Sequence, residues 1–347
     1  MPASARINAA DYARDLLSAE APLDERIRAL YMLKEAARCG DPESLSAAAM
    51  RRREAADILI LAIDTTSSVL LQNELIYNIG QFGCTAALDA LMRVAGDRER
   101  YGVVSRHEAI EAMGAIGDGA ALPFLNALVR ERMGDGASEG RERPRDDPIV
   151  ESAVLAVQRI EEAVSSARES LKPPPHCPFV SVDPAPAFPE EAFEAKDRIA
   201  KLSEILRDAS VSLWDRYRAM FSLRNIGTAR AVDALCEALR GDRTSSLFRH
   251  EVAFVLGQLE SPHAQRALAD SLRDETEHPM VRHEAAEAIG AIAEDATWPL
   301  LEEYSRHREP IVRDSCVVAL DMHRYWQQFK TPAKGMSREM GAGRATS

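Results

Sequence analysis

The 347-residue sequence predicts an all-α fold, an α-solenoid of about eight helical hairpins arranged as two tandem, pseudo-symmetric halves. Alanine and leucine dominate the sequence and β-branched residues form no alternating runs, which favours helices over strands. Apolar residues recur at i, i+3, i+4 and i+7 in successive segments, which is the stripe of a half-buried helix. The whole set of segments also recurs once along the chain. Such repeats predict hairpins that bury their apolar faces against their neighbours.

The helical segments can be located in order along the chain. The apolar stripe is clearest in residues 87–92, 121–128, 231–239 and 264–272. Glycines follow several apolar segments, and we expect them to end the preceding helices in a left-handed conformation. These glycines are Gly80, Gly114, Gly227, Gly257 and Gly290.

The chain also contains a longer repeat that spans several hairpins, because residues 26–33 match residues 216–223 and residues 150–157 match residues 312–320. We expect an N-terminal half at 8–165, a Pro-rich linker at 166–194, a C-terminal half at 195–330 and a disordered tail at 331–347. The first copy carries extra stretches within 38–62 and at 131–148. The latter is charged and Gly-rich, which predicts a mobile surface loop.

Composition narrows the class of protein. The net charge of -12 argues against a partner nucleic acid held through its phosphates, and it suits a basic or polyamine-like partner. The five cysteines are odd in number and form no CxxC motif, which fits a reducing compartment. No apolar run is long enough for a membrane span, and the N-terminus resembles no signal peptide. We therefore expect a cytoplasmic protein that binds neither membrane nor nucleic acid.

One polar pattern recurs inside otherwise apolar helices. Four segments share the frame x-His-Glu-x5-Gly, at Asn73-Glu74, His107-Glu108, His250-Glu251 and His283-Glu284. The first has asparagine where the others have histidine. A single buried His-Glu pair is more often an ordinary core pair, but three of the eight histidines share this frame and all four glutamates are present.

The frame predicts a metal site. Equivalent positions of successive repeats stack along one face of a solenoid, and the two halves can then face each other across a cleft. Imidazole nitrogens with carboxylate oxygens suit Fe, Mn or Zn, and carboxylate-rich sites with open positions suit iron that activates oxygen. Adjacent residues diverge by about 100° around a helix, so some of these carboxylates should face a substrate instead. The sequence contains no Ser-His-Asp order and no phosphate-binding glycine loop, which argues against a hydrolase and against a nucleotide-dependent enzyme.

At these residues the sequence resembles the deoxyhypusine hydroxylases, which are HEAT-repeat di-iron monooxygenases. The likeness covers nearly the whole chain. It is carried by the duplicated halves and by residues 181–186, 216–225, 248–251 and 278–284. The resemblance implies O2-dependent hydroxylation of the deoxyhypusine side chain of a translation elongation factor, which completes hypusine with the help of two irons.

The resemblance also implies roles for individual residues. One iron would be held by His250, His283 and Glu284, and the other by His107 and Glu108 with the residue at position 73. Glu74 and Glu251 would be catalytic residues in the pocket, either as metal ligands or as anchors for the substrate amines. Met280 would pack beside the substrate.

The departure from the family pattern is Asn73, because its amide oxygen is a neutral donor that suits hard cations better than iron. Two interpretations are open: a tolerated change, with Asn73 or a water molecule filling the ligand position, or a weakened first iron site. The alternative function is therefore a non-catalytic or weakly active HEAT-repeat paralogue that acts as a protein-binding scaffold. A bilin-lyase type of HEAT-like protein is a third candidate, but it leaves the His-Glu frame unexplained.

Overall fold

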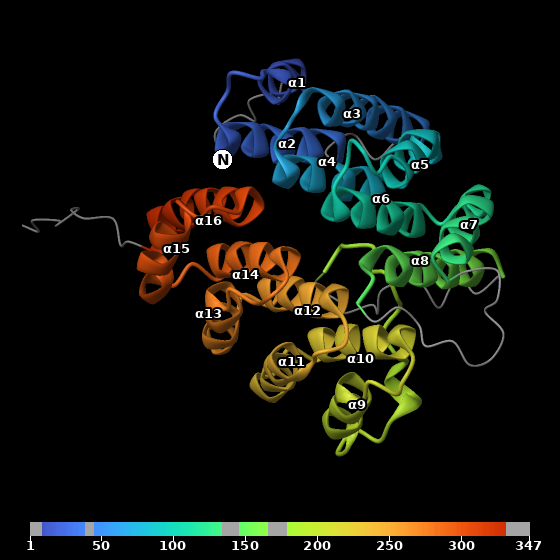
Figure 1. Cartoon of the computed structure of the whole chain (residues 1–347), viewed down its shortest axis with the longest axis vertical. Helices are drawn as coiled ribbons and strands as arrows, with labels where there is room; N and C mark the ends of the chain where they lie inside the picture. Colours follow the sequence, from blue (N-terminus) through green and yellow to red (C-terminus); the bar gives the residue numbers. More distant parts are fainter. Residues whose placement is uncertain (1–8, 39–44, 134–145, 166–178, 331–347) are drawn as a thin grey trace, which may run out of the picture.

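The computed structural model describes residues 9–38, 45–133, 146–165 and 179–330 (Figure 1). Within these ranges the chain forms sixteen α-helices and no strand. The helices of the first half are Ala9–Leu17 (α1), Leu23–Arg38 (α2), Leu45–Thr65 (α3), Val69–Phe82 (α4), Leu88–Gly96 (α5), Val103–Ile116 (α6), Leu122–Met133 (α7) and Pro148–Val164 (α8). Those of the second half are Arg198–Arg207 (α9), Leu213–Ile226 (α10), Ala229–Gly241 (α11), Ser246–Gln258 (α12), Gln265–Arg273 (α13), Pro279–Ile292 (α14), Trp298–Tyr304 (α15) and Pro310–Lys330 (α16).

Consecutive helices pair into eight hairpins, from α1 with α2 to α15 with α16. The even-numbered helices also pack against the even-numbered helices of the neighbouring hairpins and form the inner layer. The odd-numbered helices cover them on the outside (Figure 1). This arrangement confirms the predicted solenoid of two tandem halves. None of the described helices combines the length and the apolar character that crossing a membrane requires.

The two halves meet at both of their ends. At one end α16 packs against α2 and α4, and Arg28 donates a hydrogen bond to Asp321 at 2.7 Å. At the other end α8 packs against α10 and α12, and the Ser245 hydroxyl donates to Glu151 at 2.7 Å. The inner helices of one half therefore face those of the other across the centre of the molecule (Figure 1).

Four of the five glycines that we expected to end helices lie within helices instead. A Cβ at Gly80 would lie 2.8 Å from the Cα of Ala112, and a Cβ at Gly290 would lie 2.7 Å from the Cα of Ala319. Gly114 and Gly257 face Ala156 and Ala288 in the same way. These glycines let neighbouring inner helices pack backbone against backbone. Only Gly227 ends its helix with a positive φ, of 61°, as predicted.

Several predicted segments fall outside the described residues: the tail at 331–347, most of the 131–148 stretch, and residues 166–178 of the linker. For this reason the limits 8–165 and 195–330 remain our proposal for the two halves. The second part of the predicted linker is described. Residues 179–189, here called the strap, pack against both halves, and Ala185 within the strap is fully buried.

Hydrogen bonds tie the strap to each half. In the first half, the Gln81 side chain accepts a hydrogen bond from the Val182 N–H at 2.7 Å. In the second half, the Arg224 guanidinium donates to both carboxylate oxygens of Asp183, at 2.6 and 2.8 Å. The strap is thereby held at the junction between the halves.

Candidate metal centre

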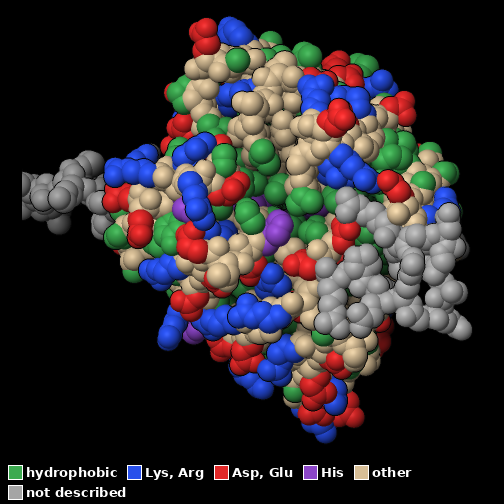
Figure 2. Space-filling view, in the orientation of Figure 1, with side chains coloured by type: hydrophobic (Ala, Val, Ile, Leu, Met, Phe, Trp, Pro, Cys, Tyr) green, Lys and Arg blue, Asp and Glu red, His purple; other side chains and the backbone are tan. Residues whose placement is uncertain are grey.

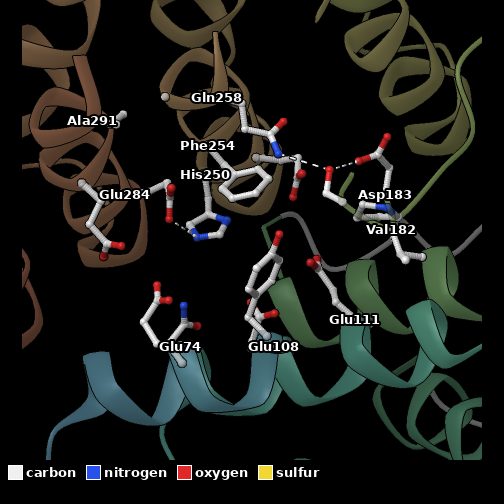
Figure 3. A pocket seen from close by; sticks show the side chains of 18 of the residues that line it. Glu74, Glu108, Glu111, Val182, Asp183, His250, Phe254, Gln258, Glu284 and Ala291 are labelled. Carbon is white, nitrogen blue, oxygen red and sulfur yellow. Dashed lines mark hydrogen bonds and ion pairs between the residues drawn. The ribbon is translucent and has the colours of Figure 1, made fainter. Parts of the chain in front are cut away.

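The His-Glu frame lies on four inner helices that face one another, α4 and α6 from the first half and α12 and α14 from the second. Between them lies a cavity of about 280 Å³. Figure 3 shows Glu74 and Glu108 on one side of this cavity, with His250 and Glu284 on the other. In the space-filling view, histidine and acidic side chains are visible near the centre of the face, where the halves meet (Figure 2). The duplicated frame is therefore brought together at one place.

The three histidines of the frame are buried side by side. The ring centroids of His107 and His250 lie 5.2 Å apart, and those of His250 and His283 lie 5.4 Å apart. All three residues are buried, and among the described residues the Nε2 atoms of His107 and His283 have no hydrogen-bond partner, while Nε2 of His250 lies 3.3 Å from a carboxylate oxygen of Glu284. Burial, followed by the neighbouring histidines, lowers the pKa of His107 and His283 well below the ordinary value, so these rings are neutral. A buried nitrogen without a partner is costly, and a neutral imidazole offers the lone pair that a metal requires.

Two groups of side chains could each hold a metal ion. In the first group, ligand atoms of His250, His283 and Glu284 all lie within 4.8 Å of one another. This is the set that the family resemblance implies for one iron. In the second group, the same holds for His107, Glu108 and Glu111. Glu74 and Glu251 line the cavity but belong to neither group.

Glu111 was not singled out from the sequence, and neither was its counterpart Glu287. Each lies four residues after a histidine of the frame, and this spacing places both side chains on the same face of the helix. Glu287 lies 3.1 Å from the Nδ1 atom of His283. The i+4 spacing was the signal that could have identified them. In α4 and α12 the same position holds Tyr77 and Phe254, whose rings meet edge to face across the cavity at 5.9 Å.

Six glutamates from the four helices line the cavity: Glu74, Glu108, Glu111, Glu251, Glu284 and Glu287. Burial first, and neighbouring carboxylates second, raise the pKa of Glu108, Glu251 and Glu287 well above the ordinary value. Burial likewise raises the pKa of Glu111 to about 7. No lysine or arginine is found among the described residues that line the cavity. Cations bound in the cavity would relieve this repulsion, so the site suits metal ions and amines.

Met280 lies next to the site but does not line the cavity, and a segment of the strap does line it. Met280, predicted to pack beside the substrate, is fully buried and is not among the residues that line the cavity. Its N–H donates to the Nδ1 atom of His278, which caps the start of α14. The strap contributes instead, since Ser181, Val182, Asp183 and Pro184 form part of the cavity wall.

The chain is similar to known repeat families. Residues 199–277 and 248–321 match HEAT repeats, and residues 105–131 match the PBS lyase HEAT-like repeat. These matches cover most of the second half and residues 105–131 of the first half.

Longer matches are found with individual proteins. The chain is 38% identical to the deoxyhypusine hydroxylase of Schizosaccharomyces pombe over 88% of this chain and 87% of that protein. It is also 38% identical to the enzyme of Gibberella zeae, although that match spans 62% of this chain and only 57% of the relative. The solved structure of human deoxyhypusine hydroxylase in complex with glycerol superposes with a TM-score of 0.75 and 37% identity, over 92% of this chain and 97% of that one. The chain therefore belongs to the deoxyhypusine hydroxylase family.

Proposed function

We propose that this protein is a deoxyhypusine monooxygenase, which hydroxylates the deoxyhypusine side chain of a translation elongation factor and so completes hypusine. The observation that carries the proposal is the cavity between the halves. Six glutamates and His250 from the four helices of the frame line this cavity, and the buried rings of His107 and His283 lie next to His250. The same activity is supported by the similarity of most of this chain to proteins named deoxyhypusine hydroxylase.

Two groups of residues would hold the metal, which we propose to be iron. His250, His283 and Glu284 would bind one ion, and His107 and Glu108 would bind the other. A pair of irons supplies the activation of O2 that is needed to introduce oxygen at a carbon–hydrogen bond. Glu287 orients His283, because its carboxylate lies 3.1 Å from Nδ1 and directs the other ring nitrogen away from itself.

The remaining carboxylates would receive the substrate. Deoxyhypusine carries a long aliphatic chain with amine groups, and Glu74 and Glu251 lie on opposite halves of the cavity without belonging to either metal group. Their carboxylates can pair with the two ammonium groups, while the rings of Tyr77 and Phe254 pack against the methylene groups. The Tyr31 hydroxyl donates to Glu74 at 2.9 Å and fixes this carboxylate in place. The net acidic charge of the protein favours the approach of a cationic substrate.

A turnover experiment tests the proposal. The full chain is loaded with Fe(II) without oxygen and then mixed with a deoxyhypusine-containing elongation factor under isotopically labelled O2. We expect mass spectrometry to show one labelled oxygen atom on the modified side chain. Glu74→Gln and Glu251→Gln should each raise the KM for this substrate by about tenfold or more, since each removes a charged partner of an amine.

The same experiment separates the alternative. A HEAT-repeat scaffold would bind the factor without transferring oxygen, even when fully loaded with iron. Binding without any labelled product would therefore favour the scaffold and contradict the enzyme.

A further inference from the structure

The two metal groups differ in one position, and this difference follows from the sequence. In the second half, α12 and α14 supply His250, His283 and Glu284. The same frame positions in the first half are Asn73, His107 and Glu108. Asn73 lines the cavity and is 5% exposed, and its Oδ1 atom has no hydrogen-bond partner in the part of the chain that the structure describes. Its neutral amide oxygen is a poor substitute for an imidazole at an iron site.

Glu111 lies where it can supply the missing ligand. One of its carboxylate oxygens lies within 4.8 Å of ligand atoms of both His107 and Glu108. Among the described residues the symmetry-related Glu287 belongs to no such group, although it follows His283 at the same spacing. The two glutamates are thus equivalent in sequence but not in their surroundings.

Their hydrogen bonds explain the difference. Glu287 lies 3.1 Å from Nδ1 of His283 and accepts a hydrogen bond from the Ser315 hydroxyl at 2.9 Å. Glu111 lies 3.9 Å from Nδ1 of His107, which is beyond hydrogen-bonding distance, and its bond from the Ser152 hydroxyl is longer, at 3.3 Å. Both ring nitrogens of the fully buried His107 have no hydrogen-bond partner among the described residues. Glu111 is therefore less firmly held by its own half than Glu287 is.

We propose that Glu111 is the third protein ligand of the first metal ion, in the place that Asn73 leaves open. This inference rests on the proposed function, because it assumes that the first group binds a metal. Ligation by Glu111 would make the two metal sites chemically different. The first has one imidazole and two carboxylates, whereas the second has two imidazoles and one carboxylate. The first site should accordingly prefer harder ions, so that Mn(II) competes with Fe(II) better there than at the second site.

Single-site variants allow each ion to be measured alone. His283→Ala removes a ligand of the second site and leaves the first, while His107→Ala does the reverse. Each full-length variant is titrated with Fe(II) in the absence of oxygen, and bound iron is measured by elemental analysis. We expect one iron per chain in each background.

The substitutions under test are then added to these backgrounds. In the His283→Ala chain, Glu111→Gln should weaken iron binding by more than about 100-fold, whereas Asn73→Ala should leave one iron bound. The matched control is Glu287→Gln in the His107→Ala chain. It should weaken binding by only about 10- to 100-fold, as the loss of an orienting partner does.

A rescue variant separates ligation from folding. Asn73→His combined with Glu111→Gln should restore iron binding at the first site, since histidine then supplies the third ligand from α4. A purely structural role of Glu111 would not be repaired by a residue on another helix.

Three results would overturn the inference. Loss of iron in Asn73→Ala with retention in Glu111→Gln would make Asn73 the ligand. Equal effects of Glu111→Gln and Glu287→Gln would make Glu111 an orienting residue. An empty first site in the His283→Ala chain, beside an occupied second site in the His107→Ala chain, would refute Glu111 as a ligand. Absence of iron from the unmodified chain would instead contradict the proposed function itself.

Discussion

The ion pair between Arg224 and the strap is expected to stabilise both the fold and the cavity wall. Arg224 is 1% exposed, and its guanidinium donates to both oxygens of Asp183 and to the Gln258 side chain at 2.9 Å. Replacing it by methionine keeps an apolar stem but leaves the carboxylate of Asp183 without its cation, at 16% exposure. Removing one partner of a buried pair costs about 3–5 kcal/mol. Because Asp183 keeps a hydrogen bond from the Ser181 hydroxyl at 2.8 Å, we expect Arg224→Met to cost about 3 kcal/mol.

The assay is urea unfolding followed by circular dichroism, carried out as a double-mutant cycle. Asp183→Asn should lose less stability when it is combined with Arg224→Met than when it is made alone, because the unpaired charge is then removed. The exposed pair of Arg93 with Asp64 provides a matched control, since Arg93→Met should cost at most about 1 kcal/mol. An equal, small cost for Arg224→Met and Arg93→Met would refute this reasoning. So would strict additivity of the two strap substitutions.

Two further substitutions test the packing and the electrostatics of the fold. Gly290→Ala places a Cβ 2.7 Å from the Cα of Ala319 and should lower the free energy of unfolding by about 1 kcal/mol or more. The control is Gly96→Ala, which should not lower it, because the added Cβ would meet only the Phe124 ring at 3.8 Å. Equal melting temperatures of the two variants would contradict the close packing of α14 on α16. Burial raises the pKa of Glu151 from 4.5 to about 7, so the folded state binds the proton more tightly and loses stability as the pH rises through this window. Glu151→Gln should therefore be more stable than the parent at pH 8 by up to about 3 kcal/mol and lose this advantage near pH 5, and a pH-independent difference in melting temperature would contradict it.

The sequence was sufficient to predict the helical repeats, the two tandem halves and a frame shared by three His-Glu pairs and one Asn-Glu pair, because each depends on a pattern repeated at fixed spacing. Glu111 and Glu287 were not predicted, although their spacing of four residues from a histidine places both side chains on one face of the helix. That spacing shows that the two side chains share a face, but only the position of the facing helix shows that this face lines the cavity. The glycines illustrate the same limit. Gly80 and Gly290 leave room for an adjacent helix, whereas Gly227 has a positive φ, and the residue type alone does not distinguish the two cases.

The strap shows a different limit. Proline-rich composition predicts an extended segment. It does not reveal that Arg224, more than thirty residues later, is buried beneath this segment and pairs with Asp183. Contacts between residues distant in sequence decide which part of such a segment becomes the wall of a site.

The most direct test of the two-metal cavity is an anomalous difference map, measured at the iron absorption edge on crystals loaded with Fe(II) in the absence of oxygen. We expect two iron peaks between the halves, one beside His250, His283 and Glu284 and the other beside His107 and Glu108. A map without iron in this cavity, or with iron bound only elsewhere on the chain, would contradict the account.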